Sequence, residues 1–390
     1  MKNKKRLLSA ALVAVMLVAT IAGCGKKDGG DSSSSEGSET FKIGGIGPLT
    51  GPAAVYGIAV QNGADLAVKE INEAGGINGK KVEFKMEDDT HDAEKAVNAY
   101  NTLKDWGMQM LMGTVTSDPC IAVEAEAEAD NMFLITPSGT AVDCIKGGNA
   151  FRLCFSDPTQ GIKAAEYIGE HGVGKKIGVI YDSSSSYSKG IYENFAKEAD
   201  NYGLEVVAAE AFTADSNKDF TVQLKKIKDA GADVVFLPIY YDETALILKQ
   251  AKDMDFDTTF FGCDGLDGLL SVEGFDTSLA EGVMLLTPFA ANAEDELTKK
   301  FVADFDAAYS QTPIQFAADG YDAIYAIKAA AEEGGITTDM SASDICDALV
   351  TSMTKIELKG LTGTISWADD GEPDKGPKAA VIEGGEYVMK

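Results

Sequence analysis

Residues 43–89 read IGGIGPLTGPAAVYGIAVQNGADLAVKEINEAGGINGKKVEFKMEDD, a stretch that predicts a strand, a helix and a second strand in that order. The first strand is expected over Phe41–Ile46. Apolar residues then recur at helical spacing over Ala54–Ala74, and the pair Gly75-Gly76 that follows is typical of a helix C-cap. Apolar and polar residues alternate over Val82–Met86, as in a strand with one buried face. This order indicates a βαβ unit with parallel strands.

The same alternation of strands and helices continues along most of the chain. Asp118-Pro119 is expected to begin one helix, with Asp118 as its N-cap and Pro119 in its first turn. Further strands are expected at Met108–Met112, Met132–Thr136, Lys176–Tyr181, Leu204–Ala209, Val234–Leu237 and Phe260–Gly262. Further helices are expected at Asp92–Trp106, Ile162–Glu170, Tyr187–Tyr202, Phe220–Ala230 and Glu243–Lys252. Repeated units of this kind imply parallel sheets covered by helices on both faces, which is the doubly wound α/β class.

These units fall into two runs, at about 41–156 and 160–286, and so predict two lobes. Two helices and two strand-like segments follow, at Ala293–Tyr309, Ile314–Glu333, Leu361–Trp367 and Ala379–Ile382. The chain is expected to cross between the lobes near Phe155–Thr159 and again near Thr287-Pro288. The expected boundaries are 41–156 plus 288–364 for lobe I and 157–287 plus 365–390 for lobe II. Several crossing strands of this kind would form a hinge.

The charge balance limits the partners of this chain. Its 390 residues include 62 acidic and 34 basic side chains, and the formal net charge is −28. A surface this negative repels phosphate backbones, so nucleic acid is not expected as a partner. The length is too great for one hydrophobic core and fits about two domains.

Motifs of catalysis and of metal binding are scarce. The two histidines, His91 and His171, lie in loop-like contexts and are expected at the surface. The sequence contains no HExxH, GxSxG or CxxC pattern, and Lys176 stands where a phosphate-binding P-loop needs Ser or Thr after Gly174-Lys175. No metal, no cofactor and no enzymatic activity are therefore expected.

The N-terminus indicates export. A basic segment that ends at Arg6 precedes an apolar run over Leu7–Ile21, which is short for a membrane span and typical of a secretory signal. The run ends in Ile21-Ala22-Gly23-Cys24, which resembles the lipobox of bacterial lipoproteins. Residues 1–23 are therefore expected to be a removed signal peptide, with lipid on Cys24 and a flexible linker over 24–40. An ordinary signal peptide and an uncleaved N-terminal anchor are the alternatives.

Five cysteines remain after Cys24. Cys144 and Cys154 flank a Gly-Gly-Asn turn and could form a disulfide across a hairpin. The alternative is a set of five unpaired, buried thiols.

Several short motifs of the opening stretch occur together with others further along. They are Gly47-Pro48-Leu49-Thr50-Gly51, Tyr56-Gly57, 71–79 (INEAGGING), Asp88-Asp89, 135–140 (ITPSGT) and Gly262-Cys263-Asp264-Gly265. As a set they resemble the leucine/isoleucine/valine-binding proteins, the type I periplasmic substrate-binding family of ABC importers. The resemblance covers essentially all of residues 41–390 and implies two Rossmann-like lobes around a ligand cleft.

The resemblance also implies which residues contact the ligand. A hydroxyl group after the third strand and the ITPSGT turn hold the ligand carboxylate in this family, and these positions are Ser117, Ser138 and Thr140 here. Ser117 directly precedes an expected helix start, where free N–H groups and the helix dipole favour an anion. The ligand ammonium is held by an acid after a late strand of the second lobe, here Asp264.

Three tyrosines complete the site that the resemblance implies. Tyr187 and Tyr240 of the second lobe are expected to close over the ligand, and Tyr56 of the first lobe to line the entrance. A tyrosine ring covers apolar groups while its hydroxyl can bond a ligand. Asp118 departs from the family pattern, because a charged side chain follows Ser117; if it reached into the cleft it would disfavour an anionic ligand.

The sequence thus predicts a monomeric, lipid-anchored, extracytoplasmic receptor of the bacterial cell membrane. It is expected to capture a branched-chain or other small amino acid by hinged closure and to deliver it to an ABC permease. The alternative is a receptor or sensor for another small solute, such as an amide, urea or an aromatic acid.

Overall fold

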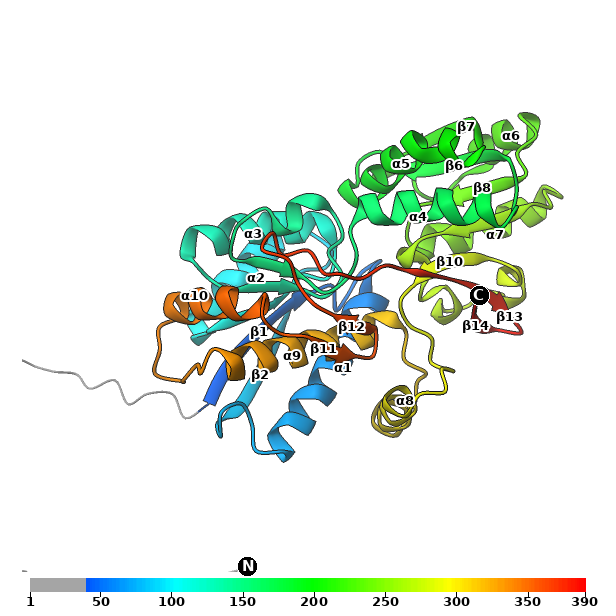
Figure 1. The fold of residues 1–390 in the computed structure, drawn as a ribbon. Helices are drawn as coiled ribbons and strands as arrows, with labels where there is room; N and C mark the ends of the chain where they lie inside the picture. Colours follow the sequence, from blue (N-terminus) through cyan, green and yellow to red (C-terminus); the bar gives the residue numbers. More distant parts are fainter. Residues whose placement is uncertain (1–39) are drawn as a thin grey trace, which may run out of the picture. The chain divides into compact units, whose positions relative to one another are not determined.

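The structure is a computed structural model of the chain, and it describes residues 40–390. The expected signal peptide, the lipobox at Cys24 and the linker up to residue 39 lie outside the described residues. Figure 1 shows two sheets, each with helices on both faces, and the doubly wound α/β class is confirmed.

The first sheet has five parallel strands in the order β2-β1-β3-β4-β5. Its strands are β1 (Thr40–Gly47), β2 (Lys81–Asp88), β3 (Met110–Gly113), β4 (Leu134–Thr136) and β5 (Ala150–Arg152). The part of the chain built on this sheet is called the first lobe below.

Successive buried side chains of these strands alternate between two layers of helices. Ile43, Met110 and Met112 belong to the hydrophobic cluster under α1 (Ala54–Glu73) and α9 (Gln315–Glu333). Ile46 and Leu111 belong to the cluster under α2 (Ala93–Trp106) and α3 (Ser117–Asp130). Burial on both faces explains why the central strand β3 (MLMG) is a continuous apolar run, whereas the edge strand β2 alternates between apolar and polar residues. A further helix, α10 (Ala342–Met353), packs beside α9.

Helices α1 and α9 approach each other through a pair of glycines. A side chain on Gly63 would place its Cβ 1.9 Å from the carbonyl oxygen of Ala317. On the partner helix, a Cβ on Gly320 would lie 2.4 Å from the carbonyl oxygen of Val60. Only glycine allows the two backbones to come this close.

The second sheet has seven strands in the order β14-β13-β10-β9-β8-β6-β7. They are β6 (Lys176–Asp182), β7 (Glu205–Phe212), β8 (Val234–Leu237), β9 (Thr259–Gly262), β10 (Met284–Thr287), β13 (Lys378–Glu383) and β14 (Glu386–Met389). Strand β13 is antiparallel to both of its neighbours, and the other pairs are parallel. The part of the chain built on this sheet is called the second lobe below.

The second sheet is also buried on both faces. Val234 and Phe236 lie in the cluster that includes α4 (Asp157–Glu170) and α5 (Ser186–Glu198). Val235 and Leu237 face the opposite layer, which contains α6 (Thr221–Asp229) and α7 (Tyr241–Asp253).

The chain passes between the two sheets three times. It leaves β5 for α4, returns after β10 through α8 (Glu296–Tyr309) to α9, and leaves again after the hairpin of β11 (Leu358–Gly360) and β12 (Gly363–Ile365) for β13. Trp367 and Glu372 of the last passage contact the first lobe at Arg152: the Trp367 indole donates to the Arg152 carbonyl (2.7 Å), and the Glu372 carboxylate lies 3.3 Å from Nε.

The predicted hairpin around Gly147–Asn149 is wrong. The segment after Cys144 enters β5, which runs parallel to β4 instead of folding back antiparallel. Cys144 and Cys154 are free and buried, and each thiol points to a backbone carbonyl, Ser117 and Gly139 respectively. The structure therefore has the alternative arrangement, in which the cysteines after residue 40 are unpaired and buried.

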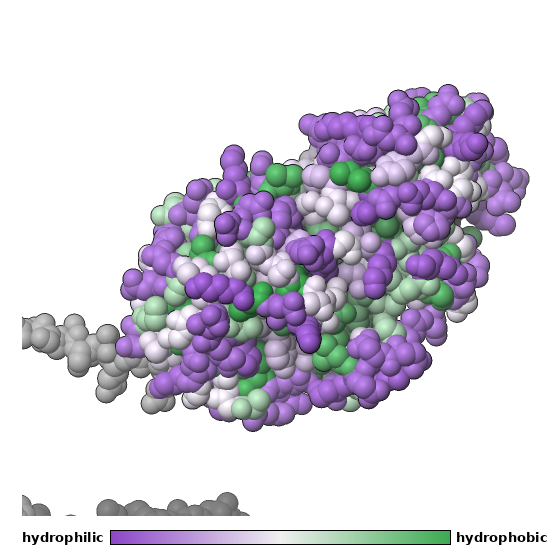
Figure 2. Space-filling model, viewed as in Figure 1, coloured by the Kyte–Doolittle hydropathy of each residue, from purple (hydrophilic) through white to green (hydrophobic). Residues whose placement is uncertain are grey.

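Most of the surface visible in Figure 2 is hydrophilic, with small apolar areas between charged groups. Within residues 40–390, no helix combines the length and the apolar character needed to cross a bilayer.

Candidate functional site

All of the predicted ligand residues follow the carboxyl ends of parallel strands. In the first lobe, Tyr56 follows β1, Ser117 follows β3, and Ser138 and Thr140 follow β4. In the second lobe, Tyr187, Tyr240 and Asp264 follow β6, β8 and β9. Ligands of open α/β sheets bind at this edge, because the loops there are free of the packing that the sheet requires.

The structure brings the three second-lobe residues together. The Tyr187 hydroxyl donates to Oδ1 of Asp264 (2.7 Å), and the rings of Tyr187 and Tyr240 lie 5.0 Å apart. Gly265 fits between them only because it lacks a side chain, since a Cβ would lie 2.6 Å from the Tyr187 hydroxyl. The tyrosines thus form a wall beside the Asp264 carboxyl group.

Burial changes the acidity of Asp264. Its side chain is almost fully buried, and loss of water raises its pKa to about 6, although the hydrogen bond from Tyr187 and the nearby Gln160 side chain oppose the rise. A carboxylate in this state gains from a cationic partner that enters the site, because the cation replaces the lost hydration.

Tyr56 reaches across to the second lobe. Its hydroxyl donates to the Gly265 carbonyl, and its ring packs edge-on against Tyr240 (5.3 Å) and Tyr241 (4.8 Å). The Tyr241 hydroxyl in turn donates to the Pro52 carbonyl of the first lobe (2.6 Å). The two lobes are therefore in direct contact beside Asp264.

The first-lobe hydroxyl groups are arranged in different ways. Ser117, the first residue of α3, accepts a hydrogen bond from the Ala141 amide (3.2 Å), and its own hydroxyl hydrogen has no acceptor in the part of the chain that the structure describes. Ser138 donates to the Val115 carbonyl (2.7 Å), so its hydrogen is committed to the protein. Oγ1 of Thr140 is buried and has no hydrogen-bond partner within the described part of the chain. Ser117 and Thr140 are the two that can donate to an anion.

A buried arginine holds the loop that carries Thr140. The Arg152 guanidinium donates to four consecutive backbone carbonyls of residues 139–142, at 2.6–3.3 Å. Its charge is balanced by Glu372, which lies 3.3 Å from Nε. The backbone carbonyls of this loop are thus turned toward the arginine, away from any anion in the cleft.

Sequence reasoning missed Asp157 and Gln160, which lie at the start of α4 in the first crossing between the lobes. Both are buried, and Asp157 Oδ1 and Gln160 Nε2 make no hydrogen bond to the described residues. Burial raises the pKa of Asp157 well above its usual range, and the nearby Thr140 hydroxyl and Arg152 offset only part of the rise. Gln160 also accepts a hydrogen bond from the Asp264 amide (3.1 Å). No local motif marks either residue.

The prediction that Asp118 is the N-cap of α3 is wrong. The N-cap is Thr116, and Asp118 lies within the first turn. Its carboxylate accepts hydrogen bonds from the hydroxyl and the amide of Ser186 at the start of α5. The prediction used only neighbouring residues, whereas the partner of Asp118 is Ser186 in the second lobe.

The prediction that both histidines lie at the surface holds only for His171, which is exposed. His91 is half-buried, shares a hydrogen bond with the Thr116 hydroxyl (2.8 Å), and its ring lies 5.6 Å from that of Tyr240. Burial lowers the pKa of His91, although acids that include Asp118 oppose the change. His91 is therefore an additional residue of the cleft. Among the described residues, no group of three or more His, Cys, Asp or Glu side chains could hold a metal ion.

Comparison with known proteins yields relatives over nearly the whole described chain. A sequence model described as periplasmic binding protein matches residues 40–385. The Leu/Ile/Val-binding protein BraC3 of Rhizobium johnstonii is 33% identical over 302 residues, which cover 77% of this chain and 81% of that protein. The leucine-, isoleucine-, valine-, threonine-, and alanine-binding protein of Pseudomonas aeruginosa is 32% identical to this chain. The match covers 78% of this chain and 82% of that protein.

A solved structure shows the same fold. It is the substrate-binding protein LivJ of a branched-chain amino acid transporter from Streptococcus pneumoniae, in complex with isoleucine. Its TM-score is 0.80 at 31% sequence identity, and the match covers 90% of this chain and 100% of the other.

Proposed function

The chain belongs to the periplasmic binding protein family, and on that premise we propose that it is the extracytoplasmic receptor of an ABC importer for a branched-chain or other small amino acid. The relatives named above bind such amino acids, and the most similar of them share about one third of their residues with this chain.

One observation carries the proposal: the cleft offers a partner to each end of a zwitterion. Asp264 supplies a buried carboxyl group for an ammonium. The free hydroxyl hydrogen of Ser117, the unpaired hydroxyl of Thr140 and the N-terminus of α3 supply donors for a carboxylate. Because either charge would be costly to bury alone, a cleft with both kinds of partner favours a ligand with both charges.

Hinged closure is part of the proposal. The moving bodies are the two lobes, 41–156 plus 288–364 and 157–287 plus 365–390. Contacts from Tyr56 to Gly265, from Tyr241 to Pro52 and from Ser186 to Asp118 join the lobes at the cleft and support a closed form. A ligand can favour that form only through its higher affinity for it.

The remaining parts of the proposal concern the membrane. Lipid on Cys24 would hold the folded part near the cell membrane, as the lipobox-like sequence before it indicates. The proposed partner there is an ABC permease, to which a monomeric receptor delivers its ligand. A sensor that uses the same cleft would show no loss of uptake when the chain is deleted.

Calorimetric titration of the purified full chain tests the substrate class. Leucine, isoleucine and valine should bind, whereas 4-methylpentanoate, which is leucine without its ammonium, should bind at least about 100-fold more weakly because Asp264 then stays unpaired. Benzoate and urea test the alternative ligands. No binding of any amino acid, or equal binding of 4-methylpentanoate, would contradict the proposal.

A variant locates the ligand. Asp264→Asn keeps the shape of the side chain and the oxygen that accepts the hydrogen bond from the Tyr187 hydroxyl, but it removes the charge. It should lose amino acid binding while its melting temperature stays the same or rises, because a buried charge is removed.

Small-angle scattering of the parent protein tests closure. The radius of gyration should be smaller with leucine than without it, and an unchanged radius would contradict hinged closure.

A further inference from the structure

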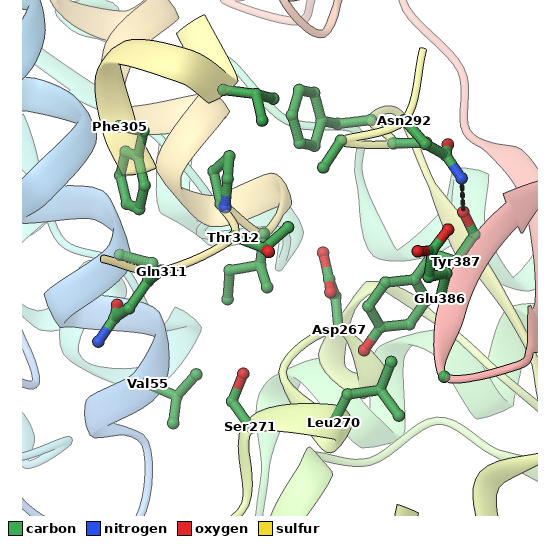
Figure 3. Close-up of a pocket in the computed structure, with 18 of the residues that line it drawn as sticks. Val55, Asp267, Leu270, Ser271, Asn292, Phe305, Gln311, Thr312, Glu386 and Tyr387 are labelled. Carbon is green, nitrogen blue, oxygen red and sulfur yellow. Dashed lines mark hydrogen bonds between the residues drawn. The ribbon is translucent and has the colours of Figure 1, made fainter. Parts of the chain in front are cut away.

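A cavity lies apart from the predicted ligand residues. It has a volume of about 740 Å³, and none of the residues predicted as ligand contacts lines it. Its walls come from the start of α1, the turn after β9, the passage after β10, α8 with the loop that follows it, and the turn before β14. Figure 3 shows side chains from these segments arranged around a common space.

The polar end of this cavity is Asp267. The residue is 3% exposed, and its Oδ2 accepts a hydrogen bond from the Gln315 amide (2.7 Å). Its Oδ1 makes no hydrogen bond to the described residues. The Tyr387 hydroxyl accepts from the Gly268 amide (3.2 Å), and it lies near enough to the Asp267 carboxyl group to oppose part of the rise in pKa that burial causes there. In Figure 3 the Asp267 side chain points into the space between Thr312 and Tyr387.

The rest of the cavity is suited to a hydrocarbon group. Val55, Ile58, Leu270, Phe289 and Phe305 form apolar walls. Ile58 is 39% exposed, which is unusual for a large apolar side chain of this protein. Burying such groups against a ligand stabilises the complex by about 25 cal/mol for each Å² of apolar surface removed from water.

Charge limits the kind of ligand further. The cavity lining contains two acids, Asp267 and Glu386, and no lysine or arginine. An anion would meet only like charges there, whereas an ammonium would meet a buried carboxyl group whose Oδ1 accepts no hydrogen bond from the described residues and has the Tyr387 hydroxyl nearby. Ser271 and Thr312 add hydroxyl oxygens to the same walls.

We propose that this cavity is a second binding site, which takes a small primary amine with a branched or aromatic hydrocarbon part. The ammonium group bonds Oδ1 of Asp267, and the hydrocarbon lies against Val55, Leu270 and Phe289. The site is separate from the amino acid cleft and does not depend on which solute the cleft takes.

Calorimetry with isopentylamine tests the site in the full chain. The titration is made with leucine present at saturation, so that the cleft is occupied. Isopentylamine should bind, and 3-methylbutyrate, which has a similar hydrocarbon part and the opposite charge, should not. Asp267→Asn should weaken isopentylamine at least about tenfold, because one charged hydrogen bond is lost.

Two further variants control the result. Glu386→Gln removes the exposed charge at the rim and should change the affinity less than about twofold, because exposed charges contribute little. Ala291→Phe fills part of the cavity. It should weaken the binding of isopentylamine and have a much smaller effect on the binding of leucine. Melting curves with and without leucine show that each variant is folded.

The outcomes separate this site from the cleft. If isopentylamine binds Asp267→Asn as well as the parent protein, the proposal is wrong. It is also wrong if Asp264→Asn removes isopentylamine binding while Asp267→Asn keeps it, since the amine then occupies the cleft. A protein that binds isopentylamine but no amino acid would contradict the proposed function and leave this site intact.

Discussion

At the scale of single residues, the proposed carboxylate site includes the Thr140 hydroxyl, which makes no hydrogen bond within residues 40–390. We expect Thr140→Val, which replaces this hydroxyl by a methyl group of similar size, to weaken leucine binding by about 10- to 100-fold, the loss of a hydrogen bond to a charged group. Its free energy of unfolding without ligand should be unchanged or slightly higher, because a buried unpaired polar atom is removed. Titration calorimetry and denaturant unfolding measure the two effects.

Thr136→Val is the matched control. The Thr136 hydroxyl is also buried, but it donates to the Thr114 carbonyl and accepts from the Gly139 amide, both at 2.7 Å. This variant should lose about 1–3 kcal/mol of stability, because the Gly139 amide is left without a partner. Equal destabilisation by both variants would mean that Thr140 is bonded within the protein after all.

The acidity of Asp264 predicts how leucine binding depends on pH. Its pKa without ligand is raised to about 6, and only the ionised form pairs with an ammonium. Affinity should therefore fall as the pH drops through 6 and be about tenfold lower at pH 5 than at pH 7, because about one carboxyl group in ten is then ionised. Calorimetry over this range measures the change; a flat profile would exclude Asp264 as the ammonium partner.

Residue positions could be predicted where they depend on a strand end nearby in the sequence. The carboxyl end of β9 and the family-like motif around it indicate Asp264, and the structure places this residue against Tyr187. Asp118 was not predictable, because its partner Ser186 lies 68 residues away, and an Asp before a proline has the local pattern of an N-cap. The position of His91 also depends on Thr116 and Tyr240, which no spacing reveals.

At the scale of elements, the glycine pair between α1 and α9 predicts a sharp difference between two substitutions. Gly63→Ala puts a methyl group where the Ala317 carbonyl lies, so the helices must separate. We expect a loss of about 1–3 kcal/mol in unfolding free energy, which is typical of overpacking. Gly148→Ala is the control, because nothing lies within 4 Å of the added methyl group. Denaturant unfolding compares them, and equal stabilities would mean that α1 and α9 adjust freely.

Most helices and strands with a clear periodic spacing of apolar residues could be predicted from the sequence. Helix α1 was expected over Ala54–Ala74 and is found over Ala54–Glu73, and β8 has the predicted ends. Strands β5, β10 and β14 and helix α10 were missed. Strand β5 and helix α10 show two reasons. The strand has three residues, too few to show a period, and it forms because β4 offers a parallel edge. The helix lies in a segment whose packing against α9 is not visible in the sequence.

At the scale of the whole molecule, several buried acids make the stability of the protein without ligand depend on pH. Burial raises the pKa of Asp89, Asp267 and Asp319 to about 7. Between about pH 4 and 7 the folded state then binds more protons than the unfolded state, so stability falls as the pH rises through this window. The melting temperature should be several degrees higher at pH 5.5 than at pH 8.

Asp89→Asn tests this explanation, because it keeps the oxygen that accepts from the His91 amide and removes the charge. It should raise the melting temperature at pH 8 more than at pH 5.5 and so reduce the difference between the two. The exposed Asp257→Asn should leave the difference unchanged. Scanning calorimetry at both pH values gives the comparison, and parallel shifts in the two variants would point to net charge instead.

The contacts of Arg152 with the end of the chain have a consequence for the order in which the protein is completed. A chain is made from its N-terminus, so Arg152 is synthesised more than two hundred residues before the Trp367 and Glu372 that bond it. Until they arrive, the Arg152 side chain that holds the turn over 139–142 lacks its ion pair with Glu372, and the acid near its charge is the buried Asp157. The turn that carries Thr140 therefore gains the last of these contacts only when the end of the chain has been made, although its own residues are made early.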